Sequence, residues 1–290
     1  MTQHTLRCGD WEATVATRGA ELQALRQGTR ERLWNAGPLW PRHAPLLFPV
    51  VGALKGEHLR HQGSILPMPK HGFARDRDFT LVVASGTSCT LLLTDTPSTR
   101  AIYPWPFRLQ VGYALSPQGL RMDIEIQNTG AEMLPASLGL HPAFPWPLVP
   151  GQPKAGHRLR FAQDEPGPLR RLDRDGLLGP AELPTPIQNR KLDLEERLFQ
   201  EDALIFLEPH SRSLRFESEG GPALEVSWEG FPHLGIWTRP DRGPAFLCIE
   251  PWAGHASPTD WDGEFSQKPG AFLLAPGATR HWSLGVTIHD

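Results

Sequence analysis

Two polar side chains in this 290-residue chain each follow an apolar run and immediately precede a proline. His141 stands in Leu138-Gly-Leu-His-Pro-Ala-Phe144, and Glu250 stands in Phe246-Leu-Cys-Ile-Glu-Pro-Trp252. Proline restricts the residue before it to extended geometry and removes the next backbone donor. We therefore expect each apolar strand to stop at this point, with an imidazole or a carboxyl group projecting from its end. Burial beside an apolar strand should also raise the pKa of the Glu250 carboxyl towards neutrality.

A third histidine, His71, lies in Pro69-Lys-His-Gly-Phe-Ala-Arg75. Gly72 permits a sharp turn at this point, and Arg75 adds a fixed positive charge. A histidine and a carboxylate are the side chains that most often act as general acid and base. Taken one at a time, each of these residues also fits a surface or capping role.

Ten tryptophans against only two tyrosines are a second chemical feature of the chain. Indole rings can stack on the faces of sugar rings while their N–H groups meet hydroxyls. Most of the tryptophans are expected to fill a large β core. We single out Trp237 and Trp252 as candidates for ligand contact, because Trp252 lies beside Glu250.

The segments that must position these residues have sequence patterns typical of β-strands. Residues 120–126 and 224–228 alternate apolar and polar side chains, which predicts half-buried strands. Short apolar runs bounded by turn residues predict strands buried on both faces at 79–84, 90–93, 203–207, 245–249 and 272–275. Glycine (28) and proline (30) make up a fifth of the chain and indicate many turns. The pattern favours an all-β protein.

Domain organisation depends on the stretch from 145 to 189, which is rich in Pro, Gly, Arg and Asp. Segments with the same strand-like patterns lie on both sides of this stretch. We therefore predict a single domain over residues 1–290, with long loops around 145–190.

Several classes of partner and site are disfavoured. The net charge is −3 with no long block of either sign, so we expect neither nucleic acid nor a membrane surface as a partner. Three widely spaced cysteines without a C-x-x-C motif indicate reduced thiols rather than a disulfide framework or a zinc site. The longest apolar stretch, residues 44–54, is too short to cross a bilayer, and we expect a cytoplasmic protein.

Seven segments in order resemble the aldose 1-epimerase (galactose mutarotase-like) family. They are 45–52, 69–75, 103–107, 138–144, 202–206, 235–240 and 248–254, and they span nearly the whole chain. The resemblance implies a β-supersandwich of large antiparallel sheets that binds a small-molecule sugar without a cofactor or metal. The His-Gly-Phe-Ala-Arg motif resembles a broader bacterial subgroup and also the hexose-6-phosphate epimerases.

The resemblance also implies roles for individual residues. Glu250 matches the family's general base, His141 its general acid and His71 a second active-site histidine. Asp202 matches a ligand of sugar hydroxyls, and Arg42 lies near the position of a substrate-binding arginine. Ring opening needs a base at the C1 hydroxyl and an acid at the ring oxygen, for which a histidine near its ordinary pKa of about 6.5 is suited. We add Arg75 and Trp237 as substrate-contact residues.

Two other functions remain open from the sequence. The same sandwich could be a carbohydrate-binding module without catalysis, although a pure binder needs neither an acid nor a base. An epimerase of phosphorylated hexoses could clamp a phosphate with four cations, namely Arg42, Lys55, Arg75 and Arg239. These cations could equally pair with acidic neighbours such as Asp76, Asp78 and Asp241. The sequence leaves the identity of the sugar and the oligomeric state open.

Overall fold

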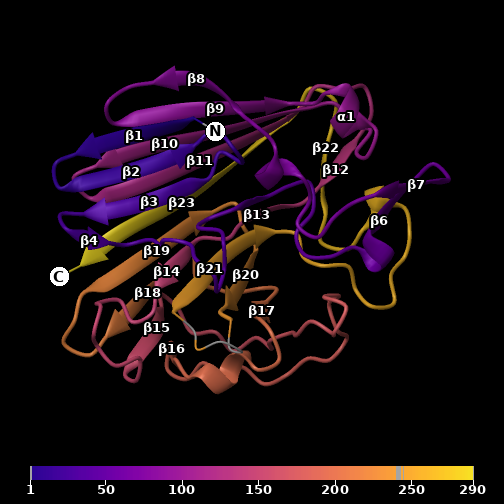
Figure 1. The fold of residues 1–290 in the computed structure, drawn as a ribbon. Coiled ribbons are helices and arrows are strands. Elements are labelled where there is room, and N and C mark those ends of the chain that lie inside the picture. Colours follow the sequence, from indigo (N-terminus) through magenta and orange to yellow (C-terminus); the bar gives the residue numbers. More distant parts are fainter. Residues whose placement is uncertain (1, 240–242, 244, 290) are drawn as a thin grey trace.

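The structure is a computed structural model that describes residues 2–239, 243 and 245–289 (Figure 1). The chain folds as an all-β supersandwich of large antiparallel sheets, which confirms the fold class predicted from the sequence. The short helix α1 (Pro97–Arg100) is capped by Thr96, whose side chain accepts from the backbone of Thr99. Within the described residues no helix has the length and apolar character needed to cross a membrane.

A nine-stranded sheet forms the widest layer. In spatial order its strands are β16 (Lys191–Asp193), β15 (His157–Phe161), β18 (Ser213–Ser218), β19 (Ala223–Glu229), β23 (Thr279–His289), β11 (Gly119–Asn128), β10 (Phe107–Ser116), β9 (Ser88–Thr94) and β8 (Thr80–Ala84). Burial alternates along β10, β11 and β19, so one face of the sheet supplies the core and the other meets solvent. The alternating segments predicted at 120–126 and 224–228 are therefore confirmed.

A second, six-stranded sheet holds the most deeply buried strand of the chain. Its strands are β17 (Leu204–Phe206), β20 (His233–Trp237), β21 (Phe246–Ala253), β13 (Leu138–Leu140) and β5 (Leu46–Leu47), with β14 (Ala143–Pro145) also paired to β21. All eight residues of β21 are buried. Antiparallel neighbours on both sides therefore hold β21 rigidly in the interior.

Smaller sheets complete the layers. The sheet of β1 (Gln3–Cys8), β2 (Trp11–Ala16), β3 (Leu22–Gln27) and β4 (Arg30–Glu31) lies against β10. Two pairs stand apart from it, namely β6 (His58–His61) with β7 (Ser64–Pro67) and β12 (Leu134–Ala136) with β22 (Phe272–Leu274) (Figure 1). Short 3-10 turns lie at Lys55–Glu57, Ala74–Asp76, Glu196–Phe199 and Phe265–Gln267.

Three expectations about buried strands are wrong. In the run 272–275, Leu273 of β22 is 47% exposed between two buried neighbours. The run 79–84 was expected to be buried on both faces, but β8 lies at the edge of its sheet and leaves Val82 and Val83 45% and 59% exposed. The run 90–93 lies in β9, where burial alternates along the strand. Apolar residues on an edge or half-buried strand have the same sequence pattern as a doubly buried one, so the runs alone could not separate the two cases.

The strand that carries Glu250 does not stop there, contrary to the expectation from Pro251. β21 continues to Ala253. The Ile249 N–H donates to the Pro142 carbonyl (3.3 Å), and N–H groups two residues apart point to the same side of a strand. The nitrogen of Pro251 therefore faces the break between β13 and β14, where the ladder needs no donor.

The segment between 145 and 189 forms one strand, β15, and otherwise turns and isolated bridges. Its middle part returns to the six-stranded sheet. The Leu178 N–H donates to the Ser257 carbonyl (2.8 Å), and the Arg170 N–H donates to the Ile205 carbonyl (2.7 Å). These bonds place Leu172 and Leu178 against the face of the sheet that carries Glu250.

Among the glycines near the face of the six-stranded sheet that carries Glu250, Gly72 should be the most sensitive to substitution. Its φ is +70°, and a Cβ added there would lie 2.2 Å from the Phe48 carbonyl oxygen. We expect Gly72→Ala to lower the free energy of unfolding by roughly 3 kcal/mol or more, because left-handed strain of about 1–2 kcal/mol adds to a backbone clash. Urea unfolding measures the loss.

Gly28→Ala is the matched control for this substitution. Gly28 also has a positive φ, +58°, but nothing lies within 4 Å of an added Cβ. It should therefore lose only about 1 kcal/mol from backbone strain. Equal losses at the two positions would contradict the role assigned to the contact with Phe48.

Candidate active site

A cavity of about 250 Å³ opens on the six-stranded sheet and collects most of the residues singled out from the sequence. Its volume lies just below the range of about 300–1,000 Å³ typical of drug-sized ligands, so it suits one small ring. Six of the seven predicted site residues line it: His71, Arg75, His141, Asp202, Trp237 and Glu250. The seventh, Arg42, does not line it and instead pairs with Asp76 (3.0 Å).

An imidazole and a carboxyl group meet at the buried side of this cavity. His141 directly follows β13, and Glu250 lies on β21, the strand paired with β13. The His141 Nε2 lies 3.2 Å from the Glu250 Oε2. The two residues are only 9% and 2% exposed. Two adjacent strands of one sheet therefore hold a candidate acid and base in contact, away from bulk water.

Burial controls the protonation of this pair. It raises the pKa of Glu250 well above its usual range, and the nearby Asp202 carboxylate adds to the rise. It lowers the pKa of His141 to about 3, with a further contribution from the positive charge of Arg75. The expectation that His141 keeps its ordinary pKa is therefore wrong in this structure, because desolvation disfavours the imidazolium. A proton shared by the pair then lies on the carboxyl group.

His71 presents its imidazole from a strained turn. Its φ is +67°, an uncommon value for a residue other than glycine. Two hydrogen bonds to Gly52 hold it: the His71 N–H donates to the Gly52 carbonyl (2.9 Å), and the Gly52 N–H donates to the His71 Nδ1 (3.1 Å). Burial and the neighbouring His141 hold the pKa of His71 well below its usual range. Since Nδ1 accepts a hydrogen bond in a neutral ring, the proton resides on Nε2 and makes that atom a donor.

Asp202 lies on the solvent side of the cavity just before β17. Its φ of +65° is also left-handed. Its Oδ1 accepts from the Ala203 N–H (2.7 Å), and its backbone carbonyl accepts from Arg171 Nη1 (2.8 Å). These two bonds fix the carboxylate at the mouth, where it can accept hydrogen bonds from ligand hydroxyls.

Positive charges gather on the wall formed by the His71 turn. Lys70 and Arg75 line the cavity, and together with Arg42 they lower the pKa of both histidines. Arg75 is anchored by donating to the Lys70 carbonyl (2.7 Å). Lys70 was missed in the sequence, although its place beside His71 in the same motif was an available signal.

Two cations of the suggested phosphate clamp lie elsewhere. Lys55 donates to the Thr259 carbonyl (2.9 Å), and Arg239 donates to the Leu39 carbonyl (3.2 Å). Neither residue lines the cavity. The third suggested acid, Asp241, lies outside the described residues. The structure therefore brings one of the four suggested cations, Arg75, to the cavity and adds Lys70 to it.

Tryptophans form a second wall. Trp237 and Trp252 line the cavity, and so does Trp40, which the sequence did not distinguish from the tryptophans expected in the core. Trp40 is half-buried and stacks on the His141 ring with centroids 5.0 Å apart. Its position two residues before Arg42 gave no sign of this contact, because the loop that carries it has no strand periodicity.

The spacing of three side chains in this region would by itself allow them to bind a metal ion. Ligand atoms of His141, Cys248 and Glu250 all lie within 4.8 Å of one another. Burial raises the pKa of the Cys248 thiol well above its usual range, so the thiolate that metals bind is disfavoured. The positive charges of Lys70 and Arg75, which line the same cavity, also repel a cation. These residues suit proton transfer better than metal binding.

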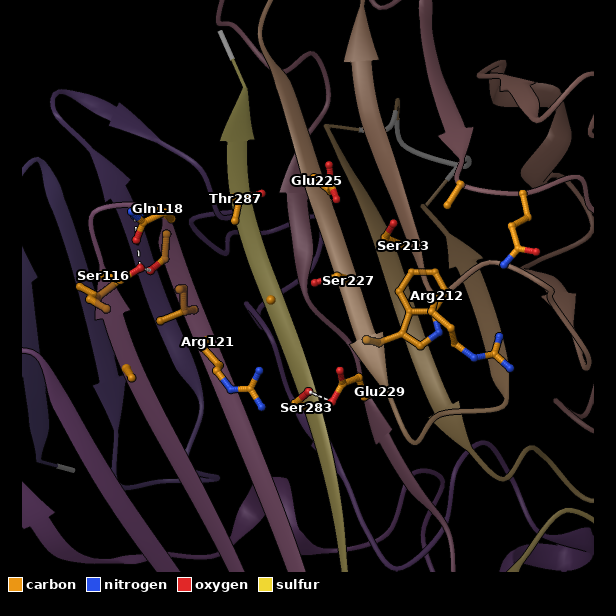
Figure 2. A pocket seen from close by; sticks show the side chains of 18 residues that line it. Ser116, Gln118, Arg121, Arg212, Ser213, Glu225, Ser227, Glu229, Ser283 and Thr287 are labelled. Atoms are coloured by element: carbon orange, nitrogen blue, oxygen red, sulfur yellow. Dashed lines mark hydrogen bonds between the residues drawn. The ribbon is translucent and has the colours of Figure 1, made fainter.

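A larger groove, of about 620 Å³, lies on the solvent face of the nine-stranded sheet (Figure 2). Small side chains such as Ser213, Ser227 and Ser283 form its floor, and Ser283 Oγ donates to Glu229 Oε2 (3.4 Å) (Figure 2). None of the seven site residues predicted from the sequence lines this groove. The smaller cavity is therefore the candidate active site, since it alone of the two pairs a buried base with a buried acid in the described part of the chain.

Comparison with known proteins connects this geometry to a sugar-processing family. A family model described as aldose 1-epimerase matches residues 2–272. The protein LacX of Lactococcus lactis subsp. lactis is 30% identical over 283 residues, which cover 94% of each chain. A galactose mutarotase related enzyme from Lactobacillus acidophilus is 29% identical with a TM-score of 0.92, covering 100% of this chain and 98% of that one. A galactose mutarotase-like protein from Lactobacillus casei ATCC 334 is 26% identical with the same TM-score, covering 99% and 100%.

His141, which is buried, and His71, which is half-buried, should remain uncharged in the native protein from pH 8 down to about pH 5, because desolvation lowers the pKa of His71 well below its usual range and that of His141 to about 3. NMR of the imidazole C–H groups tests this directly. In urea the same groups should titrate near about 6.5. The unfolded chain then binds protons that the native chain does not, so their contribution to the free energy of unfolding falls as the pH drops below that value. A native titration midpoint near 6.5 for either ring would show that it is not desolvated.

Proposed function

Because the chain belongs to the aldose 1-epimerase family, we propose that it is a mutarotase that interconverts the α and β anomers of an aldohexose. One observation carries the proposal: a buried carboxyl group and a buried imidazole lie 3.2 Å apart in a cavity sized for one ring. Mutarotation needs one base and one acid at neighbouring oxygens, and this pair can supply both.

The pair acts by moving a single proton. A bound sugar places its C1 hydroxyl and ring oxygen between Glu250 and His141 and replaces their direct contact. Hydroxyls that donate to Glu250 favour its ionised form and so transfer the shared proton to His141. The complex then holds a carboxylate base and an imidazolium acid, and the pair carries the same number of protons as before.

Ring opening and closure follow from that state. Glu250 takes the proton of the C1 hydroxyl, the C1–ring oxygen bond breaks as the C1 carbonyl forms, and His141 protonates the departing ring oxygen. Rotation about C1–C2 exposes the other carbonyl face. The same transfers in reverse close the ring as the opposite anomer and return each proton to its starting group. The scheme balances with protons alone and needs no cofactor.

Other residues of the cavity orient the sugar. The Nε2–H of His71 can donate to the ring oxygen or to a neighbouring hydroxyl, since Gly52 occupies its Nδ1. Asp202 at the mouth accepts from hydroxyls, and Trp237 offers an indole wall. Arg42 remains a predicted substrate contact that would act from the rim. A carbohydrate-binding module without catalysis has no use for the buried acid–base pair, which favours the enzyme.

Glu250→Gln should reduce the anomeric exchange rate by about 10²–10⁴-fold, because a positioned acid or base contributes that much and an amide cannot accept the C1 proton. Polarimetry or NMR of freshly dissolved α-D-glucose and α-D-galactose measures the rate. Glu229→Gln is the matched control, since Glu229 lies in the outer groove. It should keep the wild-type rate, whereas a wild-type rate in Glu250→Gln would refute the assignment of the base.

A second candidate function is 1-epimerisation of a hexose 6-phosphate. The positive wall favours it: Lys70 and Arg75 line the cavity, and Arg42 lies close enough to lower the pKa of both histidines. Arginine and lysine side chains are the usual partners of phosphate oxygens. The acid–base chemistry would be unchanged, so only the preferred substrate separates the two functions.

Lys70→Met tests this alternative. If the substrate is phosphorylated, the variant should raise KM for glucose 6-phosphate by about tenfold, as expected for loss of one charge-assisted bond of about 1.5 kcal/mol, and leave KM for glucose unchanged. Competition by inorganic phosphate gives a second measurement. Equal effects on both sugars, with no inhibition by phosphate, would leave the neutral aldohexose as the substrate.

A further inference from the structure

The imidazole of His141 lacks the support that usually orients a catalytic histidine. Its Nε2 contacts Glu250, but its Nδ1 is buried and has no hydrogen-bond partner among the residues described. In most histidine sites the second ring nitrogen is held by a carboxylate or a carbonyl, which sets the ring plane. Another interaction must therefore hold this ring in place.

Aromatic rings supply that support. Trp40 stacks on the His141 ring with centroids 5.0 Å apart and planes 27° apart. Trp237 meets the same ring edge-on, at 5.7 Å and 79°. A stacked ring fixes the plane of the imidazole, and an edge contact limits its rotation within that plane.

Trp40 is itself held on several sides. Its ring stacks on Phe246 with centroids 5.3 Å apart, and Phe246 is on β21, four residues before Glu250 and on the same face of the strand. Its backbone carbonyl accepts from the Trp34 indole (3.0 Å) and from the Gly37 N–H (3.1 Å). Trp40 therefore connects the strand that carries the base to the ring that serves as the acid.

We propose that Trp40 is a positioning residue for the reaction, which orients the His141 imidazole by stacking in place of a hydrogen bond to Nδ1. The π face of indole also attracts a cation. It thus stabilises the imidazolium formed when the shared proton moves from Glu250, against the positive charges of Lys70 and Arg75. The inference rests on the acid role proposed for His141.

The test compares Trp40→Leu, which removes the ring, with Trp40→Phe, which keeps a stacking face. Trp40→Leu should lower kcat by about 10- to 100-fold, the cost of misplacing a reacting group, and change KM by less than about threefold. The alkaline limb of its kcat profile should move to lower pH by about half a unit, because the imidazolium loses a favourable contact. Trp40→Phe should remain within about threefold of the wild-type kcat.

Trp261→Leu is the matched control, since Trp261 is also half-buried but does not line the cavity. It should keep the wild-type kcat and pH profile. NMR gives a readout independent of activity: the ring current of Trp40 should shift the His141 C–H resonances upfield in the wild type and in Trp40→Phe, and not in Trp40→Leu.

Three outcomes would overturn the inference. An unchanged kcat in Trp40→Leu would show that stacking is not needed for orientation. A rise in KM alone would make Trp40 only a platform for the sugar, and an equal loss in Trp40→Phe would exclude stacking as the cause. Failure of the acid–base proposal looks different: Glu250→Gln would then keep the wild-type rate, whereas failure here leaves Glu250→Gln inactive and Trp40→Leu active.

Discussion

The structure depends on one contact, the buried pair of His141 and Glu250. Taking an ionised carboxylate or imidazolium out of water costs several kcal/mol for each ion, so neither charge persists alone at this depth. Side by side, the two groups share one proton and can remain neutral together. The pair can therefore occupy the interior of a β-sheet without an uncompensated charge, and it can become an ion pair when a ligand supplies hydrogen bonds.

Such a pair needs a rigid scaffold, whereas the residues around it must adapt to a ligand. The fold places the pair on strands and the surrounding residues on turns. The proposed acid directly follows β13 and the proposed base lies on β21, and these two strands are paired in the interior sheet. The residues proposed to orient the ligand lie on turns, where His71 and Asp202 both adopt left-handed backbone conformations. Left-handed geometry at residues other than glycine costs about 1–3 kcal/mol and persists only where surrounding contacts enforce it. Here the two hydrogen bonds to Gly52 and the bonds to Ala203 and Arg171 enforce it.

The sequence predicted the parts of this site that depend on local chemistry. The prolines after His141 and Glu250, and the glycine after His71, singled out three residues that the structure brings together in one cavity, and alternation predicted β11 and β19. Sequence reasoning failed where tertiary context decides. Nothing in the local pattern shows that Pro251 faces a break between two strands, that β8 lies at an edge, or that the irregular loop of Trp40 returns to cover His141. The pKa of His141 was misjudged for the same reason, because its burial is produced by residues distant in sequence.

The two walls of the cavity act on the shared proton in opposite directions. The cations Lys70, Arg75 and Arg42 lower the pKa of His141 and so oppose the imidazolium that the proposed reaction requires. The stacked Trp40 ring favours that same charged form. A neutral sugar brings no negative charge to this wall, so its hydroxyls must supply the whole shift of the proton through their bonds to Glu250. An anionic sugar would also neutralise the positive wall, which would raise the pKa of His141 as it binds. The charge of the preferred substrate and the protonation of His141 are therefore linked. The more negative the sugar, the further its binding alone moves the shared proton from Glu250 to His141.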